Sequence, residues 1–283
     1  MRRDPIPRPD VNDARPGSFL RRRLGWNRAS YVLLSTFLLV IFLLAYVWWP
    51  LAEEYLAQID WQGPWWRQLD WLLVGIFLFM TLVLMAGADL RADGRIVLVG
   101  LVGGLVIESW GTQTELWTYY TLERPPLWII PAWPIASLTI DRLVRYASRR
   151  TAGHPPAGYR LLYWLIFPAF YGLMLSFVWP TLDKSFTLIA LALCLFLLAT
   201  PTDYRQAVLT FAAGSGLGYF LELWGTTRLC WTYYTLQTPP LFAVLAHGMA
   251  AVAFWRAALL LSMVLAALRR RWPWPVAGLR DPL

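Results

Sequence analysis

Long, uncharged apolar runs recur along the chain. The first, "YVLLSTFLLVIFLLAYVWW", occupies residues 31–49 and has the length that an α-helix needs to cross about 30 Å of hydrocarbon. Further runs begin near Trp71, Ile96, Leu127, Leu161, Ser185, Gln206 and Leu241. Because the runs are continuously apolar, without the alternation of β-barrel strands, they predict eight transmembrane helices.

The composition agrees with this pattern, because 58% of the residues are hydrophobic, 15% are charged and 18 are tryptophans. Such values are typical of an all-α integral membrane protein. Cys194 lies inside a predicted helix and Cys230 in a loop. Two separated cysteines exclude a disulfide framework and a cysteine-rich metal site.

Charge predicts the orientation of the chain in the membrane. Residues 1–30 are rich in Arg and Pro, which predicts a disordered basic tail without a cleaved signal peptide. This tail, the linker 145–160, the shorter loops on the same side and the tail 269–283 hold most of the 25 Lys and Arg residues. By the positive-inside rule both termini are cytoplasmic, and we expect a multi-pass protein of the bacterial inner membrane. Topology and lipid headgroups account for the net charge of +8, so no nucleic-acid partner is expected.

A repeated segment divides the chain into two similar halves. "ESWGTQTELWTYYTLERPPL" at 108–127 returns as "ELWGTTRLCWTYYTLQTPPL" at 222–241, with thirteen of twenty positions identical. The same offset aligns further glycine, Asp and Arg positions, and an insertion within 51–70 is expected to form an interfacial helix. We therefore predict two parallel four-helix repeats, 31–144 and 161–268, related by an axis along the membrane normal.

A carboxylate and two glycines share one face of the third helix in each half. In the first half they are spaced by four residues, and the second half repeats the spacing; the two sets are Gly100, Gly104, Glu108 and Gly214, Gly218, Glu222. We expect the two glycine faces to pack together and to bring both carboxylates inward near the outer leaflet. Simple helix packing explains the glycines as well, but a glutamate within a span is costly and is a candidate for function.

Aromatic residues follow each glutamate in the same order. The candidate substrate-binding residues are Trp110, Trp117, Tyr119 and Tyr120 in the first half, and Trp224, Trp231, Tyr233 and Tyr234 in the second. Trp and Tyr also collect at the headgroup level of many membrane proteins. The sequence leaves both interpretations open, an interfacial belt and an aromatic-lined cavity over two acids.

The halves differ at one chemically important position, where Trp133 corresponds to His247. His247 is predicted at a depth similar to that of Glu222, so the two side chains could share a proton. A hydrogen-bonded packing role is the alternative for this histidine. The candidate catalytic residues are Glu108, Glu222 and His247.

Two arginines near these segments are expected to have specific roles. Arg124 lies in the loop after Glu108 and corresponds to Thr238 in the second half, so it is expected to be a cation near the first glutamate. Arg256 lies in the last span and is expected to extend toward the cytoplasmic surface or to pair with Asp141 or Asp203.

Other common chemistries leave no motif in the sequence. A phosphate-binding Walker loop, a dinucleotide fingerprint, a paired-histidine zinc motif and a nucleophile elbow are all missing. We therefore expect no cofactor and no metal. Any chemistry depends on carboxylates, phenols, indoles and His247.

The order E-x-W-G-T, W-T-Y-Y and a Pro-rich start of the next helix, "PPLWIIPAW", resembles the membrane-bound carotenoid hydratases and small lycopene cyclases. The similarity covers about 20 residues in each half, and the Pro-x-Glu-Glu motif of the cyclases is missing. The resemblance implies a hydrophobic isoprenoid substrate that Glu108 or Glu222 protonates as general acid. It implies that aromatic rings stabilise the carbocation and that His247 or the other glutamate takes up the returning proton.

Three classes of function remain open at this stage. The first is an enzyme that acts on an isoprenoid or other lipid by acid/base chemistry in an outer-leaflet cavity. The second is a transporter or lipid flippase with its site between the repeats. The third is a non-catalytic membrane subunit or assembly factor. Membrane lipids are expected partners in all three.

Overall fold

The computed structural model describes residues 25–271, so most of the two predicted tails lie outside the described residues. The protein is all-α, apart from two strands of three residues each. The helices are α2 (Arg28–Val47), α3 (Trp49–Ala57), α4 (Trp71–Met85), α5 (Leu90–Gln113), α6 (Ala132–Arg150), α7 (Pro156–Val178), α8 (Ser185–Ala199), α9 (Tyr204–Thr227) and α10 (Leu241–Arg271). The short 3₁₀ helices η1 (Trp65–Arg67) and η2 (Trp179–Thr181) and the strands β1 (Trp117–Tyr119) and β2 (Trp231–Tyr233) complete the elements.

Several of these helices have the character of membrane spans. Four are long and apolar enough to cross a bilayer: Arg28–Val47, Pro156–Thr181, Tyr204–Thr227 and Leu241–Leu268. The apolar helices α4 and α8 are shorter. Large apolar side chains such as Phe42 and Phe196 are exposed on the outside of the bundle, as expected for a surface that faces lipid. The predicted all-α fold with several membrane-spanning helices is confirmed, with four helices that are long and apolar enough to span. That eight helices cross the membrane stays a prediction.

Polar side chains cap the first turns of α2, α5 and α9, just before the apolar residues of each helix. The Asn27 side chain accepts from the Ser30 backbone N–H, and the Ser30 hydroxyl accepts from the Asn27 backbone N–H, which together form a capping box. Asp89 caps α5 and Asp203 caps α9, each through its carboxylate. The repeated aspartates therefore start the two helices that carry the glutamates.

The segments between and after the predicted repeats are more helical than expected. The predicted linker 145–160 is reduced to residues 151–155, because α6 continues to Arg150 and α7 begins at Pro156. Arginines in a last helical turn and proline in a first turn both favour these ends. The last helix continues to Arg271, beyond the predicted boundary at residue 268.

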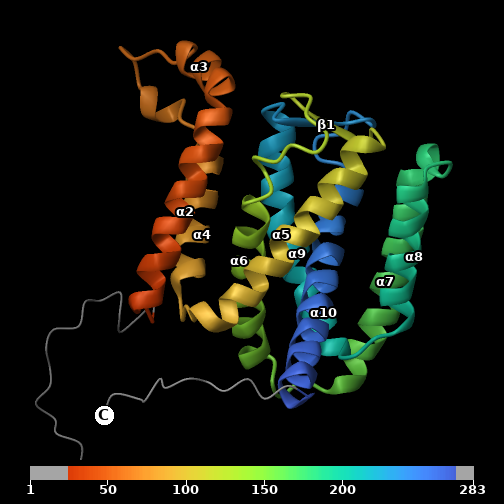
Figure 1. Ribbon diagram of the computed structural model, residues 1–283. Coiled ribbons are helices and arrows are strands. Elements are labelled where there is room, and N and C mark those ends of the chain that lie inside the picture. Colours follow the sequence, from red (N-terminus) through yellow and green to blue (C-terminus); the bar gives the residue numbers. More distant parts are fainter. Residues whose placement is uncertain (1–24, 272–283) are drawn as a thin grey trace, which may run out of the picture.

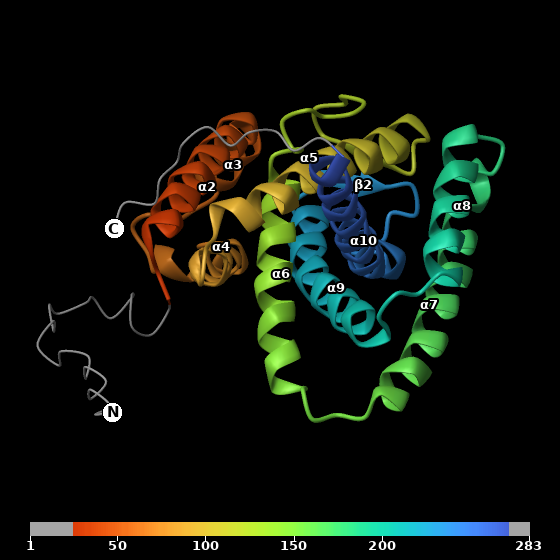
Figure 2. The same cartoon turned by 60° about the horizontal axis from the view of Figure 1, so that its bottom comes forward.

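The centre of the bundle is formed by α5, α6, α9 and α10, and other helices flank it on two sides (Figures 1 and 2). In the centre, α9 contacts α6 and α10, and α5 contacts the same two helices. The pair α2 and α4 lies on one side and the pair α7 and α8 on the other. In Figure 1, β1 and α3 lie at the end of the bundle opposite to the start of α2 and the end of α10.

The two copies of the aromatic motif meet in a small antiparallel sheet. Thr118 of β1 lies opposite Thr232 of β2, and the flanking pairs are Trp117 with Tyr233 and Tyr119 with Trp231. The rings of Trp117 and Tyr233 are 5.8 Å apart, and those of Tyr119 and Trp231 are 5.9 Å apart. Segments separated by 114 positions in the sequence thus form one structure over the end of the central helices.

The expectation that the two glycine faces pack against each other is wrong. Gly104 on α5 faces Trp133 of α6, and a Cβ added there would lie 2.4 Å from Trp133 Cγ. Gly218 on α9 faces His247 of α10, and its Cβ would lie 2.5 Å from His247 Cβ. Each glycine face therefore receives a ring from the following helix, because a side chain that large needs the space that glycine leaves.

Candidate functional site

Glu108, near the end of α5, is buried and accepts hydrogen bonds from three side chains. Trp117 Nε1 donates to Oε2 at 3.0 Å, the Tyr119 hydroxyl to Oε1 at 2.9 Å, and Trp133 Nε1 to Oε1 at 3.1 Å. Hydrogen bonds of this kind offset the cost of burying a carboxylate. All three donors are aromatic, and they come from β1 and α6.

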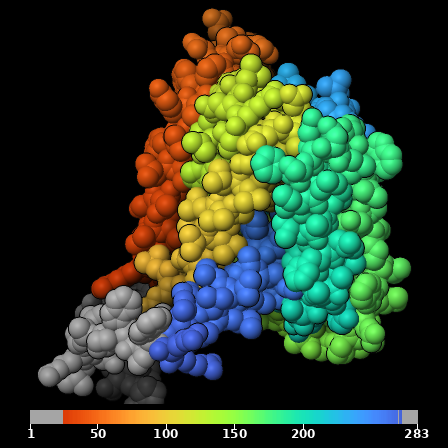
Figure 3. Space-filling view, turned by 45° about the vertical axis from the view of Figure 1, so that its right-hand side comes forward, coloured from red at the N-terminus to blue at the C-terminus, as the bar shows by residue number. Residues whose placement is uncertain are grey.

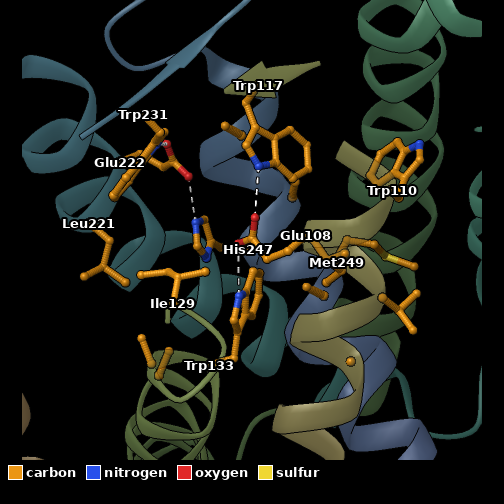
Figure 4. A pocket seen from close by; sticks show the side chains of 18 of the residues that line it. Glu108, Trp110, Trp117, Ile129, Trp133, Leu221, Glu222, Trp231, His247 and Met249 are labelled. Atoms are coloured by element: carbon orange, nitrogen blue, oxygen red, sulfur yellow. Dashed lines mark hydrogen bonds and ion pairs between the residues drawn. The ribbon is translucent and has the colours of Figure 1, made fainter. Parts of the chain in front are cut away.

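Glu222 occupies the equivalent place on α9 and is buried in the same way. Trp231 Nε1 donates to Oε2 at 2.9 Å and the Tyr233 hydroxyl to Oε1 at 2.9 Å. The third contact differs, because His247 Nε2 lies 2.9 Å from Oε1 (Figure 4). The structure therefore brings the predicted pair Glu222 and His247 together.

The glycine of each Trp-Gly-Thr segment lets the next tryptophan fold back over the helix. A Cβ at Gly111 would lie 1.9 Å from Trp117 Cη2, and one at Gly225 would lie 2.0 Å from Trp231 Cη2. Each indole thus lies against the bare helix backbone, and its N–H points at the glutamate. This contact explains the conserved spacing of Glu, Gly and Trp between the two copies.

The two phenols that contact the acids are deeply buried. Burial raises the pKa of Tyr119 well above its usual value, and the nearby Glu108 raises it further. Burial and Glu222 have the same effect on the pKa of Tyr233. Both hydroxyls therefore keep their hydrogen at neutral pH and donate it to the carboxylates.

Trp133 and His247 link the two glutamate sites. Their rings are stacked, with centroids 5.8 Å apart and an interplanar angle of 19°. Glu108, Trp133, His247 and Glu222 thus form a continuous row through the centre of the protein (Figure 4). Trp133 was not among the site residues predicted from the sequence, although its correspondence with His247 was the signal that could have identified it.

A cavity of about 780 Å³ surrounds this row of side chains. Its wall includes both glutamates, His247 and six of the eight predicted substrate-binding residues: Trp110, Trp117, Tyr119, Trp224, Trp231 and Tyr233. Most of the remaining wall consists of Leu, Ile, Val, Ala, Phe and Met side chains. An apolar cavity with a few convergent polar groups fits a hydrophobic ligand.

The cavity reaches the outer surface between α5 and α8. Val106 of α5 and Ile189 of α8 are both more than half exposed and both line the cavity. In Figure 3 a part of α10 is visible between these two helices, and Ala253 of α10 belongs to the same wall. The exposed side chains around this opening are apolar, among them Phe186 and Leu193 of α8.

Two of the predicted substrate-binding residues lie outside the cavity wall. The Tyr120 hydroxyl donates to the carbonyl of Val47 at the end of α2. The Tyr234 hydroxyl donates to the carbonyl of Phe177 near the end of α7, at 2.6 Å. Tyr120 and Tyr234 thus attach their loops to the flanking helices.

Trp110 and Trp224 connect the central helices to the flanking pairs. Trp110 Nε1 donates to Thr187 Oγ1 in α8 at 3.2 Å. Trp224 Nε1 donates to Asp70 Oδ2, at the start of α4, at 2.9 Å. Each indole lines the cavity with its ring and bonds to the other half of the chain with its N–H.

The structure gives the contacts of two arginines that the sequence singled out. Arg124 pairs with the exposed Glu115 at 2.7 Å and not with Glu108. Arg256 donates to the carbonyl of Thr200 at 2.7 Å. Of its two expected alternatives, the pair with an aspartate is not formed, and the side chain extends toward the end of α8. The carbonyls at the end of α8 have no partner within the helix and are therefore available as acceptors for this half-buried guanidinium.

Among residues 25–271, no three His, Cys, Asp or Glu side chains are grouped in a way that could hold a metal ion. Comparisons with protein-family models, curated proteins and solved structures find no match. The functional interpretation therefore depends on the geometry of the site.

Proposed function

We propose that the protein is a multi-span membrane enzyme that acts on a hydrophobic unsaturated lipid by carboxylate acid/base chemistry. One observation carries this proposal: two buried glutamates and an imidazole lie together in the wall of a large apolar cavity. Ionisable groups inside a membrane protein are costly and commonly serve transport or catalysis. An imidazole next to a carboxylate is a suitable pair for proton transfer.

The aromatic residues of the cavity fit the same proposal. Protonation of a carbon–carbon double bond produces a carbocation, which the negative faces of indole and phenol rings stabilise. Trp117, Trp231 and Tyr233 present such rings beside the carboxylates. The resemblance to carotenoid hydratases and small lycopene cyclases favours an isoprenoid as the substrate.

We place the site near the outer leaflet of the bacterial inner membrane. In this arrangement eight helices cross the bilayer as two parallel four-helix repeats, with both termini in the cytoplasm. Arginines support this orientation, because they lie in the last turns of α6 and α10, at the end of the bundle opposite to β1. The matching hydrogen bonds around Glu108 and Glu222 support the repeats.

The test compares lipids and pigments, by mass spectrometry, in cells with and without the gene. We expect an isoprenoid to change when the gene is removed and to return with the wild-type gene but not with Glu108→Gln/Glu222→Gln. Glu53→Gln, at an exposed position of α3, is the matched control and restores the wild-type profile. An identical profile in all strains contradicts the enzyme proposal.

A transporter or flippase is the second candidate, because the cavity lies between the halves and opens sideways toward lipid. A transported molecule crosses the membrane unchanged. Uptake or lipid translocation by reconstituted liposomes that is lost in Glu108→Gln, with no change of the lipid itself, would favour this candidate over the enzyme.

A further inference from the structure

The two glutamate sites differ at a single hydrogen-bonding partner, and the two partners differ in their proton chemistry. At Glu108 the third partner is the indole of Trp133, and at Glu222 it is the imidazole of His247. Both rings fill the space over a glycine of the preceding helix, so they occupy equivalent places. An indole N–H only donates, whereas an imidazole nitrogen gives up or accepts a proton near neutral pH.

The hydrogen bonds of Glu108 leave it no partner for proton exchange. Two of its donors are indoles and the third is the buried phenol of Tyr119, and all three keep their hydrogens at neutral pH. At Glu222, Trp231 and Tyr233 are equivalent fixed donors. His247 is the one group that can exchange a proton with a glutamate in this row.

We infer that the two halves have separate roles, an inference that rests on the proposed function. Glu222 and His247 exchange the proton with the substrate. Glu108 and Trp133 position the imidazole of His247. The stacked indole of Trp133 supports one face of His247, and Glu108 orients that indole through its N–H. A ring stacked in this way also stabilises the imidazole when it is protonated. Glu108 is therefore a positioning residue, whereas Glu222 and His247 are catalytic residues.

The proposed step balances without any further reactant. The proton that His247 and Glu222 share across their hydrogen bond passes to the substrate through Glu222. The O–H bond formed on Glu222 breaks, and its hydrogen forms a C–H bond with the electron pair of the substrate double bond. This leaves a cation on the neighbouring carbon and a carboxylate on Glu222. Loss of an adjacent C–H proton to the Glu222 and His247 pair forms a double bond at a new position and restores the pair. The class of reaction is an isomerisation, with or without ring closure.

Kinetics of the purified protein in detergent test the separation of roles, with the isoprenoid that accumulates in cells without the gene as the substrate. His247→Gln keeps a hydrogen bond to Glu222 but cannot carry the proton, so we expect kcat to fall at least about 100-fold with little change in KM. Trp133→Phe keeps a ring against His247 and is expected to lower kcat less. His154→Gln, in the loop between α6 and α7, is the control and keeps wild-type kinetics. Wild-type kcat in His247→Gln, or an equal loss in Trp133→Phe, overturns the inference.

A spectroscopic measurement tests the pair without any substrate. The chain has two histidines, so in His154→Gln protein labelled with ¹⁵N-histidine, His247 is the only source of signal. We expect Glu222→Gln to shift the Nε2 resonance of His247 strongly and Glu108→Gln to shift it less. An Nε2 resonance that Glu222→Gln leaves in place overturns the inference.

Together the measurements separate failure of the inference from failure of the proposed function. If a lipid changes in cells but His247→Gln is fully active, the protein is an enzyme and the assigned roles are wrong. If the Nε2 resonance depends on Glu222 but no lipid changes in any strain, the hydrogen bond exists and the catalytic role is wrong together with the proposed function.

Discussion

At the scale of single residues, glycines determine where the rings of the candidate site lie. Gly111 and Gly225 make room for Trp117 and Trp231, and Gly218 makes room for His247. In each case the distance to an added Cβ is far below a normal contact. The glycines of the repeat therefore act through the side chains that they admit and not through flexibility.

Replacing Gly218 tests this role. Gly218→Ala places a methyl group against the rigid Cβ of His247, so we expect a loss of about 1–3 kcal/mol in the free energy of unfolding. Gly216→Ala is the matched control on the same helix, because nothing lies within 4 Å of its added Cβ. Alanine favours a helix over glycine, so the control is expected to keep or slightly raise stability. Denaturant unfolding in detergent measures both, and equal effects would contradict the argument.

At the scale of elements, a buried ion pair holds α5 against α6 far from the site. Arg142 of α6 donates to Asp93 of α5 at 2.6 Å, and both side chains are almost completely buried. Arg142 also pairs with Asp141 at 2.8 Å. Because α5 carries Glu108 and α6 carries Trp133, this pair helps to keep the two in register.

Removing the arginine leaves a buried carboxylate without its partner. We expect Arg142→Leu to lower the free energy of unfolding by about 3–5 kcal/mol. The exposed pair of Arg124 and Glu115 is the comparison, and Arg124→Leu is expected to cost about 1 kcal/mol or less. Unfolding curves of the two variants in the same detergent check the difference. A loss in Arg142→Leu no larger than that in Arg124→Leu would show that the buried pair adds little.

At the scale of the whole molecule, the end that carries β1 and the end where α6 and α10 finish in arginines are opposite (Figure 1). The loop after β1 carries the exposed Glu123, and the exposed Arg150 ends α6 on the other side. Both native cysteines, Cys194 and Cys230, are buried. Cysteines introduced into the loops can therefore report which side of the membrane each end faces.

A membrane-impermeant maleimide applied to cells with a permeable outer membrane tests the orientation. We expect Glu123→Cys to be labelled in intact cells and Arg150→Cys only after the inner membrane is opened. The protein without an added cysteine is the control for background labelling. The reverse pattern would place the termini outside and would contradict the cytoplasmic assignment.

Much of the architecture follows from local properties of the sequence. Runs of apolar residues predicted the long helices, because each run must bury itself in lipid or protein. The repeated segment predicted equivalent places for Glu108 and Glu222, and the depth of His247 predicted its contact with Glu222. These relations extend over one helix or one pair of neighbouring helices, where a fixed rise per residue determines distances.

The sequence by itself determined which residues are apolar, which are repeated and which could carry a proton. Only the tertiary structure decided which residues contact each other. Trp133 donates to Glu108, whereas Tyr120 and Tyr234 bond to flanking helices outside the cavity wall. Each glycine face packs against a helix of its own half. The physical reason is that a periodic pattern defines the faces of a helix but not the helix that covers each face. That choice depends on how rings and glycines from distant segments fit together in a close-packed interior.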